Sequence, residues 1–260
     1  MFDSMRARGF QVDFASHAAA ILTVDFPEAI AELEEAFAKF SIPIEEIVGS
    51  GGGETKGTQR LRRALAKLGW PKTTFTIEKQ VNGAPRGSTS HEVDHVRVFP
   101  QGVVALEIEW NNKDPFYDRD LENFKRLHAE GAIAVGVVVT RGSSLQDELV
   151  PMVRRFAEER QVSGLEDLLR FGLNPTKRQQ NDFERRMRAG ISFAEAWSQS
   201  FVQDKFGQAT THWRKLDDRL KRGVGNPCPL VLIGLPASVV TFEERLDVAR
   251  IAGGDESVVS

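Results

Sequence analysis

Three carboxylates near the middle of the chain have a spacing that could hold a cation: Asp94, Glu107 and Glu109. Residues around them are mostly β-branched or apolar, and they are interrupted once by a group of turn-forming residues. This pattern predicts a β-hairpin, with strands over residues 93–98 and 103–110 around the turn Pro100-Gln101-Gly102.

The turn sets the register of the expected hairpin. If the residue numbers of cross-strand partners add up to 201, Asp94 lies opposite Glu107, and Glu92 lies opposite Glu109. Because strand side chains alternate, these four acids would share one face. The opposite, buried face would carry Leu106, Ile108 and Trp110.

Carboxylates directly opposite one another destabilise a hairpin unless a cation or water compensates their charge. Converging carboxylate oxygens suit a hard ion such as Mg²⁺, with Mn²⁺ as a substitute. Such an ion would bind a scissile phosphate and activate water. The chemistry favoured by these acids is therefore phosphodiester hydrolysis.

The elements before the hairpin are expected to be helical. Apolar residues recur at helical spacing over residues 25–40, with Asp25 as a cap and Pro27 in the first turn. A loop over residues 49–57 (GSGGGETKG) follows, and then a basic amphipathic helix over residues 58–68. The loop lacks the Gly-Lys-Ser/Thr of a phosphate loop, which excludes nucleotide binding there.

After the hairpin, helix and strand alternate. Residues 118–130 form a helical pattern, and the uninterrupted apolar run at 132–139 predicts a strand buried on both faces. The chain is expected to be helical up to residue 160 and mostly helical over 174–222, with a last strand at 230–235. The fold class is therefore α/β or α+β, with a central mixed sheet flanked by helices and a right-handed crossover.

Charge is unevenly distributed, although the net charge is only −3. Residues 51–72 and 176–222 each carry a local charge of +5, so the remainder of the chain is strongly acidic. Such segments suit a surface that follows phosphates. The single cysteine, Cys228, excludes an internal disulfide and fits a reducing cytoplasm, and the one apolar N-terminal run, residues 18–24, is too short for a membrane span.

Several segments carry a resemblance to a known family. Asp94 followed by Glu107-Ile108-Glu109 resembles the PD-(D/E)XK nuclease signature, in the variant of the BamHI and BglII restriction endonucleases where Glu or Gln replaces the usual lysine. The string VALEIEWNNKDPFYDRDLENFKRLH (residues 104–128) resembles the core of the BglII family. So do SHAAAIL (16–22), GSGGGETKG (49–57), Gly69-Trp70 and VVVTRG (137–142).

This resemblance implies roles for individual residues. Asp94 and Glu107 would bind the metal together with the main-chain carbonyl of Ile108. Glu109 stands where the lysine usually is, and it would accept a proton from water or hold a metal-bound water. Glu54 resembles a supporting acid from the preceding helix, although it could equally satisfy the dipole of that helix.

The DNA contacts are expected from loops at the ends of the same strands and from the basic helix. Asn and Gln side chains can read adenine, and Lys and Arg can read guanine or hold phosphates. The candidates are Lys56, Arg60, Asn111, Asn112, Lys113, Arg141, Ser143, Ser144 and Gln146. None of the five histidines has metal-ligand spacing, and His91 and His95 are interpreted as structural.

The resemblance implies a type II restriction endonuclease that cuts double-stranded DNA, acts as a homodimer in the cytoplasm and is paired with a DNA methyltransferase. Residues 1–150 would form the nuclease core, and residues 151–260 a basic, helical DNA-contacting segment whose final strand returns to the core. Alternatives are a repair or recombination nuclease and a non-catalytic DNA-binding protein. A glycoside hydrolase is disfavoured, because the chain has one tyrosine and two basic segments.

Overall fold

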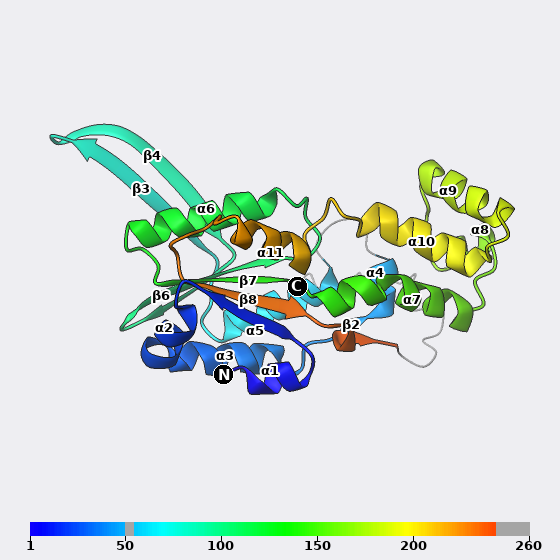
Figure 1. Cartoon of the computed structure of the whole chain (residues 1–260), viewed down its shortest axis with the longest axis horizontal. Coiled ribbons are helices and arrows are strands. Elements are labelled where there is room, and N and C mark those ends of the chain that lie inside the picture. The colour runs from blue at the N-terminus through cyan, green and yellow to red at the C-terminus, as the bar shows by residue number, and fades with distance from the viewer. Residues whose placement is uncertain (50–54, 243–260) are drawn as a thin grey trace, which may run out of the picture.

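A central five-stranded sheet organises the molecule (Figure 1). The computed structural model describes residues 1–49 and 55–242. The strand order is β1-β8-β7-β6-β5. The strands are β1 (Gln11–Ala15), β5 (His95–Phe99), β6 (Gly102–Glu109), β7 (Val135–Arg141) and β8 (Leu230–Leu235).

The three inner strands β6, β7 and β8 are parallel, and the edge strands β1 and β5 are antiparallel to their neighbours. Every residue of β7 and β8 is buried, as expected of strands covered on both faces. The chain leaves the sheet after β7 and returns to it as β8, which lies between β1 and β7. The expected mixed sheet flanked by helices is therefore confirmed.

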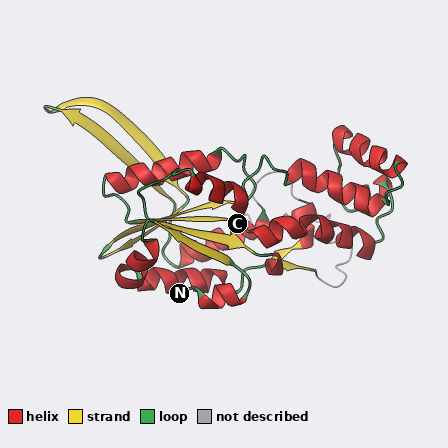
Figure 2. Cartoon of the chain, in the orientation of Figure 1, coloured by secondary structure: helices red, strands yellow, loops and turns green. Residues whose placement is uncertain are grey.

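Helices cover both faces of this sheet (Figure 2). One face packs on α6 (Phe116–Ala129) and α11 (Trp213–Lys221). The other face belongs to the larger core, to which helices from both ends of the chain contribute. These are α1 (Asp3–Ala7), α2 (Ala18–Asp25), α3 (Pro27–Ala38), α4 (Ile44–Val48), α5 (Lys56–Lys67) and α7 (Ser143–Glu159).

Close packing of α6 on the sheet depends on a glycine in β7. A Cβ added at Gly136 would lie 2.6 Å from a ring carbon of Phe124, which α6 presses onto the strand. A larger residue would push the helix outward. The absence of a side chain at this position therefore allows α6 to lie close to the strands beneath it.

A long two-stranded arm projects from the body of the molecule (Figure 1). It consists of β3 (Thr73–Val81) and β4 (Ala84–Val93), which pair antiparallel, and most of its residues are exposed. The sequence analysis did not predict it, because few of its residues are apolar. The base of β4 leads directly into Asp94 and β5, so the arm joins the body of the molecule at the β5–β6 hairpin.

The remaining helices lie at the end of the molecule furthest from the arm (Figure 1). They are α8 (Leu165–Arg170), α9 (Lys177–Arg188) and α10 (Phe193–Lys205). Near them, β2 (Ile42–Pro43) and β9 (Val240–Thr241) form a short parallel pair, and a 3-10 turn, Ala237–Val239, precedes β9. No helix in the described part of the chain has the length and apolar character needed to span a membrane.

Most of the expected elements are present, with small differences at their ends. The predicted strand at 230–235 coincides with β8, and the basic helix expected at 58–68 is α5. The expected cap was wrong. Asp25 is the last residue of α2, and α3 begins after Phe26 with Pro27 in its first turn. The fixed φ of proline suits a helix start that has no side-chain cap.

Candidate active site

Strand β6 points its two acids toward helix α6. Ala105, two residues before Glu107, packs in the same core as the apolar residues of α6. Leu106, Ile108 and Trp110 pack in the core on the opposite face. Alternation along the strand therefore places Glu107 and Glu109 beneath α6, where both are almost completely buried.

Asp94 lies where the chain bends between β4 and β5. The register of β5 and β6 pairs His95 with Leu106, so the predicted sum of 201 is confirmed. Continued by one residue, this register brings Asp94 to Glu107, and the main-chain nitrogen of Asp94 donates to Oε2 of Glu107 over 3.4 Å. The Asp94 carboxylate accepts a 2.7 Å hydrogen bond from Arg62 of α5.

Glu92 does not join this cluster as expected. It belongs to β4 and pairs with Thr74 of β3, so the prediction that it lies opposite Glu109 was wrong. Its carboxylate forms an exposed ion pair with Lys72. The physical reason is the bend at Asp94, which separates β4 from the catalytic hairpin.

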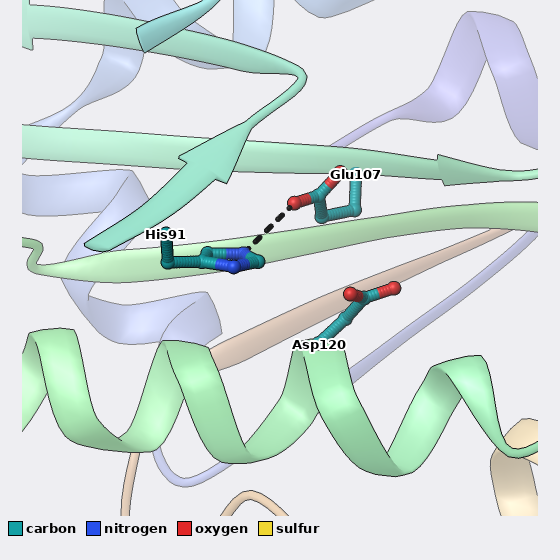
Figure 3. A group of neighbouring side chains, drawn as sticks. All are labelled: His91, Glu107 and Asp120. Carbon is teal, nitrogen blue, oxygen red and sulfur yellow. Dashed lines mark ion pairs between the residues drawn. The ribbon is translucent and has the colours of Figure 1, made fainter. Parts of the chain in front are cut away.

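A fourth acid reaches the cluster from α6. Asp120 is only 1% exposed, and its carboxyl group lies close to those of Glu107 and Glu109. His91 of β4 completes the group, with Nε2 3.4 Å from Oε1 of Glu107 (Figure 3). Ligand atoms of His91, Glu107 and Asp120 all lie within 4.8 Å of one another.

Sequence reasoning missed Asp120 and assigned His91 no role. A signal for Asp120 was present, because Asp120 and Asn123 interrupt the otherwise apolar face of α6. Polar residues on a buried helix face need a partner. Asn123 has such a partner in His91, whose Nδ1 lies 2.8 Å from the amide nitrogen.

Burial and mutual repulsion perturb these acids strongly. Burial, reinforced by the nearby Asp120 and Asp94 carboxylates, raises the pKa of Glu107 to about 10. Burial and the adjacent Asp120 carboxyl likewise raise the pKa of Glu109 to about 9. Without a cation, both acids therefore hold a proton at neutral pH.

Glu109 has neighbours that distinguish it from Glu107. Its carboxylate accepts a 2.7 Å hydrogen bond from the Asn112 amide, which lies just beyond the strand. Arg119 of α6 places a guanidinium nitrogen 3.9 Å from Glu109 and stacks on the Phe116 ring. Arg119 is about half exposed, so it can also reach a bound phosphate.

These groups open into one cavity of about 340 Å³. Its walls combine acids with two guanidinium groups, an arrangement that can hold both a cation and a phosphate. The lining residues are Arg62, His91, Glu92, Asp94, Glu107, Ile108, Glu109, Asn112 and Arg119. The predicted catalytic acids, Ile108 and Asn112 are therefore brought together.

The donor set fits a divalent cation. Oε1 of Glu107 and Oδ2 of Asp120 are buried and have no hydrogen-bond partner among the described residues. Arg119 donates a 2.8 Å hydrogen bond to the other Asp120 oxygen, whereas Glu107 can lose its proton only if a further positive charge lies beside it. Oxygen ligands from acids and a main-chain carbonyl are those that Mg²⁺ prefers.

Other predicted contacts lie outside this cavity. Lys56 is exposed at the start of α5, whereas Arg60 forms a 2.6 Å ion pair with Glu46. Glu54 lies outside the described residues. Asn111 is half-buried and Lys113 is exposed in the loop after β6.

The DNA contacts predicted at the end of β7 instead make hydrogen bonds within the protein. Arg141 is completely buried, donates to Thr210 and Thr211, and lies over the Phe206 ring. Three further candidates, in the first turn of α7, also make hydrogen bonds within the protein. The main-chain N–H of Ser143 donates to Gln11, and the Ser144 hydroxyl accepts from the main-chain N–H of Ala237. The Gln146 amide donates to the Phe206 carbonyl. Their part in binding DNA stays a prediction, and Ser144 is the most exposed of them.

The basic segment 174–222 neutralises part of its own charge. On α9, Asp182 pairs with both Arg185 and Arg186. On α11, Arg219 is buried between Asp114 and Asp118. Helix α11 lies beside α6, whereas α9 is at the far end of the molecule (Figure 1).

The sequence model of a family described as "Restriction endonuclease BglII/BglIII" matches residues 10–235, which is most of the chain. The matched range includes all five strands of the central sheet and each of the acids in the cavity. No curated protein gives a significant match.

Proposed function

Because the chain belongs to the BglII/BglIII family of restriction endonucleases and is therefore a type II, site-specific deoxyribonuclease, we propose that Asp94, Glu107 and Glu109 are its catalytic residues. The observation that supports this most directly is the convergence of these acids in one cavity, with a buried Glu107 oxygen that lacks a hydrogen-bond partner. Family membership also decides against a glycoside hydrolase.

Enzymes of this family act with a divalent metal ion, and we propose Mg²⁺, with Mn²⁺ as a substitute. Asp94, Glu107 and the Ile108 carbonyl would hold it. When bound, the ion neutralises charge on the scissile phosphate and makes water a better nucleophile. Each of these three residues lines the cavity, and carboxylate and carbonyl oxygens are the ligands that Mg²⁺ prefers.

The other side chains of the cavity position the reacting groups. Arg62 fixes the Asp94 carboxylate through its 2.7 Å hydrogen bond. Asn112 orients Glu109, which accepts a proton from the attacking water or holds that water in place. Arg119, beside Glu109 and partly exposed, would bind a non-bridging phosphate oxygen.

The substrate is double-stranded DNA, since the family consists of restriction endonucleases. Cutting both strands of a two-fold symmetric site requires two active centres related by the same symmetry, so we propose a homodimer. A cell that contains such an enzyme must protect its own DNA. We therefore also propose a cytoplasmic location and a partner DNA methyltransferase.

The test is DNA cleavage by variants that remove one charge at nearly constant shape. Asp94→Asn and Glu107→Gln are expected to lower the rate by at least about 100-fold, since each removes a ligand of the ion. Glu122→Gln, on the exposed side of α6 beside Lys125, is the matched control and should cleave within about two-fold of wild type. Wild-type rates in Asp94→Asn and Glu107→Gln would overturn the assignment.

A further inference from the structure

We propose that His91, Glu107 and Asp120 form a second cation site, next to the Asp94 site and selective for a transition metal such as Zn²⁺. This inference deepens the proposed function, because it shares Glu107 with the proposed Mg²⁺ site. The two sites differ in their other ligands, so each can be tested separately.

Three different elements bring the ligands together (Figure 3). His91 comes from the base of the β4 arm, Glu107 from the centre of β6 and Asp120 from α6. The Glu107 carboxyl group is turned toward the imidazole of His91, and the Asp120 side chain rises from α6 toward the same region. Their ligand atoms lie within 4.8 Å of one another, so small side-chain movements would suffice to surround an ion.

The distance between His91 and Glu107 is suited to shared coordination. Nε2 and Oε1 are 3.4 Å apart, which is too long for a strong hydrogen bond. Two ligands on a tetrahedral ion with bonds of about 2.1 Å are separated by about 3.4 Å. The two atoms therefore already have the spacing of neighbouring ligands.

Unpartnered oxygens provide an independent indication of a ligand. Oε1 of Glu107 and Oδ2 of Asp120 accept no hydrogen bond from any described residue, and both side chains are at least nine-tenths buried. A polar atom buried in this way costs free energy. Oδ1 of Asp120 already accepts a 2.8 Å hydrogen bond from Arg119, so a cation would compensate the two remaining oxygens, Oδ2 of Asp120 and Oε1 of Glu107.

Glu107 can serve both sites because its two oxygens face different neighbours. Oε2 lies 3.4 Å from the Asp94 main-chain nitrogen, and Oε1 lies 3.4 Å from His91. The Asp94 carboxylate itself accepts a hydrogen bond from Arg62. A carboxylate that bridges two ions is a common feature of enzymes that hydrolyse phosphodiesters.

The imidazole determines which metal the second site prefers. Mg²⁺ favours oxygen ligands, whereas Zn²⁺ binds imidazole nitrogen together with carboxylates. The Asn123 oxygen accepts from Arg126, so its amide nitrogen donates to Nδ1 of His91. This contact places the imidazole proton on Nε2, toward Glu107. Metal binding through Nε2 must move that proton to Nδ1 and turn the Asn123 amide.

Because Nε2 can bind a metal only when the imidazole proton is on Nδ1, a variant that favours this tautomer should bind Zn²⁺ more tightly. In Asn123→Asp, a carboxylate replaces the amide and accepts the Nδ1 proton, and the hydrogen bond from Arg126 becomes an ion pair. Carboxylate–histidine pairs of this kind commonly change metal affinity about 10-fold or more. Zn²⁺ affinity should therefore rise about 10-fold in Asn123→Asp, although no ligand is altered.

The experiment is calorimetric titration of metal-free protein with Zn²⁺, supported by the visible absorption of Co²⁺ in the same site. Removing a ligand in His91→Ala or Asp120→Asn should weaken Zn²⁺ binding at least about 10-fold, and the Co²⁺ absorption should be lost. His17→Asn is the matched histidine control, since His17 is exposed and asparagine tolerates its positive φ. It should bind Zn²⁺ as wild type does.

Asp94→Asn separates this proposal from the proposed function. It should abolish Mg²⁺ binding and leave Zn²⁺ affinity within about three-fold, because Asp94 is not a ligand of the second site. Unchanged Zn²⁺ affinity in both His91→Ala and Asp120→Asn would overturn the proposal. If these variants fail to fold, as judged by thermal melting, unchanged Zn²⁺ affinity in Asn123→Asp would overturn it instead.

Discussion

Replacement of Glu107 by glutamine should stabilise the metal-free protein at neutral pH. Burial raises the pKa of Glu107 to about 10 and that of Glu109 to about 9. In the unfolded chain both acids return to about 4.3. An acid whose pKa is higher in the folded state stabilises that state fully at a pH below its unfolded pKa. This stabilisation is lost as the pH rises toward the folded pKa. Between these limits, unfolding of the wild type releases protons.

The pH dependence of the free energy of unfolding follows from the number of protons that unfolding releases. Each proton released changes the free energy of unfolding by about 1.4 kcal/mol per pH unit. With two such acids, the free energy of unfolding of the wild type should therefore fall by about 5 kcal/mol between pH 5.5 and 7.5. Glu107→Gln removes one of them, so its loss over the same range should be about 3 kcal/mol.

The assay is urea unfolding in EDTA at pH 5.5, 6.5 and 7.5, followed by circular dichroism. Glu122→Gln, whose carboxylate is exposed on α6, should keep the wild-type pH dependence. Adding Mg²⁺ should stabilise the wild type, by about 2.7 kcal/mol at 100 times the dissociation constant, and should not stabilise Glu107→Gln. A wild-type free energy that is flat between pH 5.5 and 7.5 would refute the reasoning, as would an equal slope in Glu107→Gln.

Three further outcomes are expected. DNA cleavage should occur with Mg²⁺ or Mn²⁺ and stop in excess EDTA, and Ca²⁺ should support binding with little turnover; a gel digest that is complete in EDTA would contradict this. With Ca²⁺ present, the dissociation constant for DNA should rise at least about 10-fold between 50 and 200 mM salt in a filter-binding assay, and a constant value would exclude extensive phosphate contacts. In urea unfolding, Gly136→Ala should lower the free energy of unfolding by about 1–3 kcal/mol, because the added Cβ would overlap Phe124. The control Gly87→Ala, whose Cβ would have nothing within 4 Å, should change it by less than about 0.5 kcal/mol.

Local sequence patterns predicted much of the catalytic hairpin. A two-residue turn between Phe99 and Gly102 permits only one register for the flanking strands, and this register brings Asp94 to Glu107. The continuous apolar run of β7 likewise indicated a strand buried on both faces, and the last strand, β8, was also predicted. These features depend on neighbouring residues, so the sequence alone was enough to predict them.

Other elements depend on partners far away in the chain. Strand β1 is too short to be recognised alone, and it forms because it pairs with β8, more than 200 residues later. The β3–β4 arm has little apolar alternation, since most of it is exposed. In this arm Glu92 pairs with Thr74 rather than lying opposite Glu109, although it still lines the cavity, and His91 lies beside Glu107.

The sequence by itself determined which acids of β6 share a face, because alternation along a strand is a local property. It did not determine what covers that face. Only the tertiary structure decided that α6 packs over Glu107 and Glu109, with Gly136 allowing the close approach. That packing buries both acids and adds Asp120 from the helix, so their pKa values and their demand for a cation arise from contacts between separate elements.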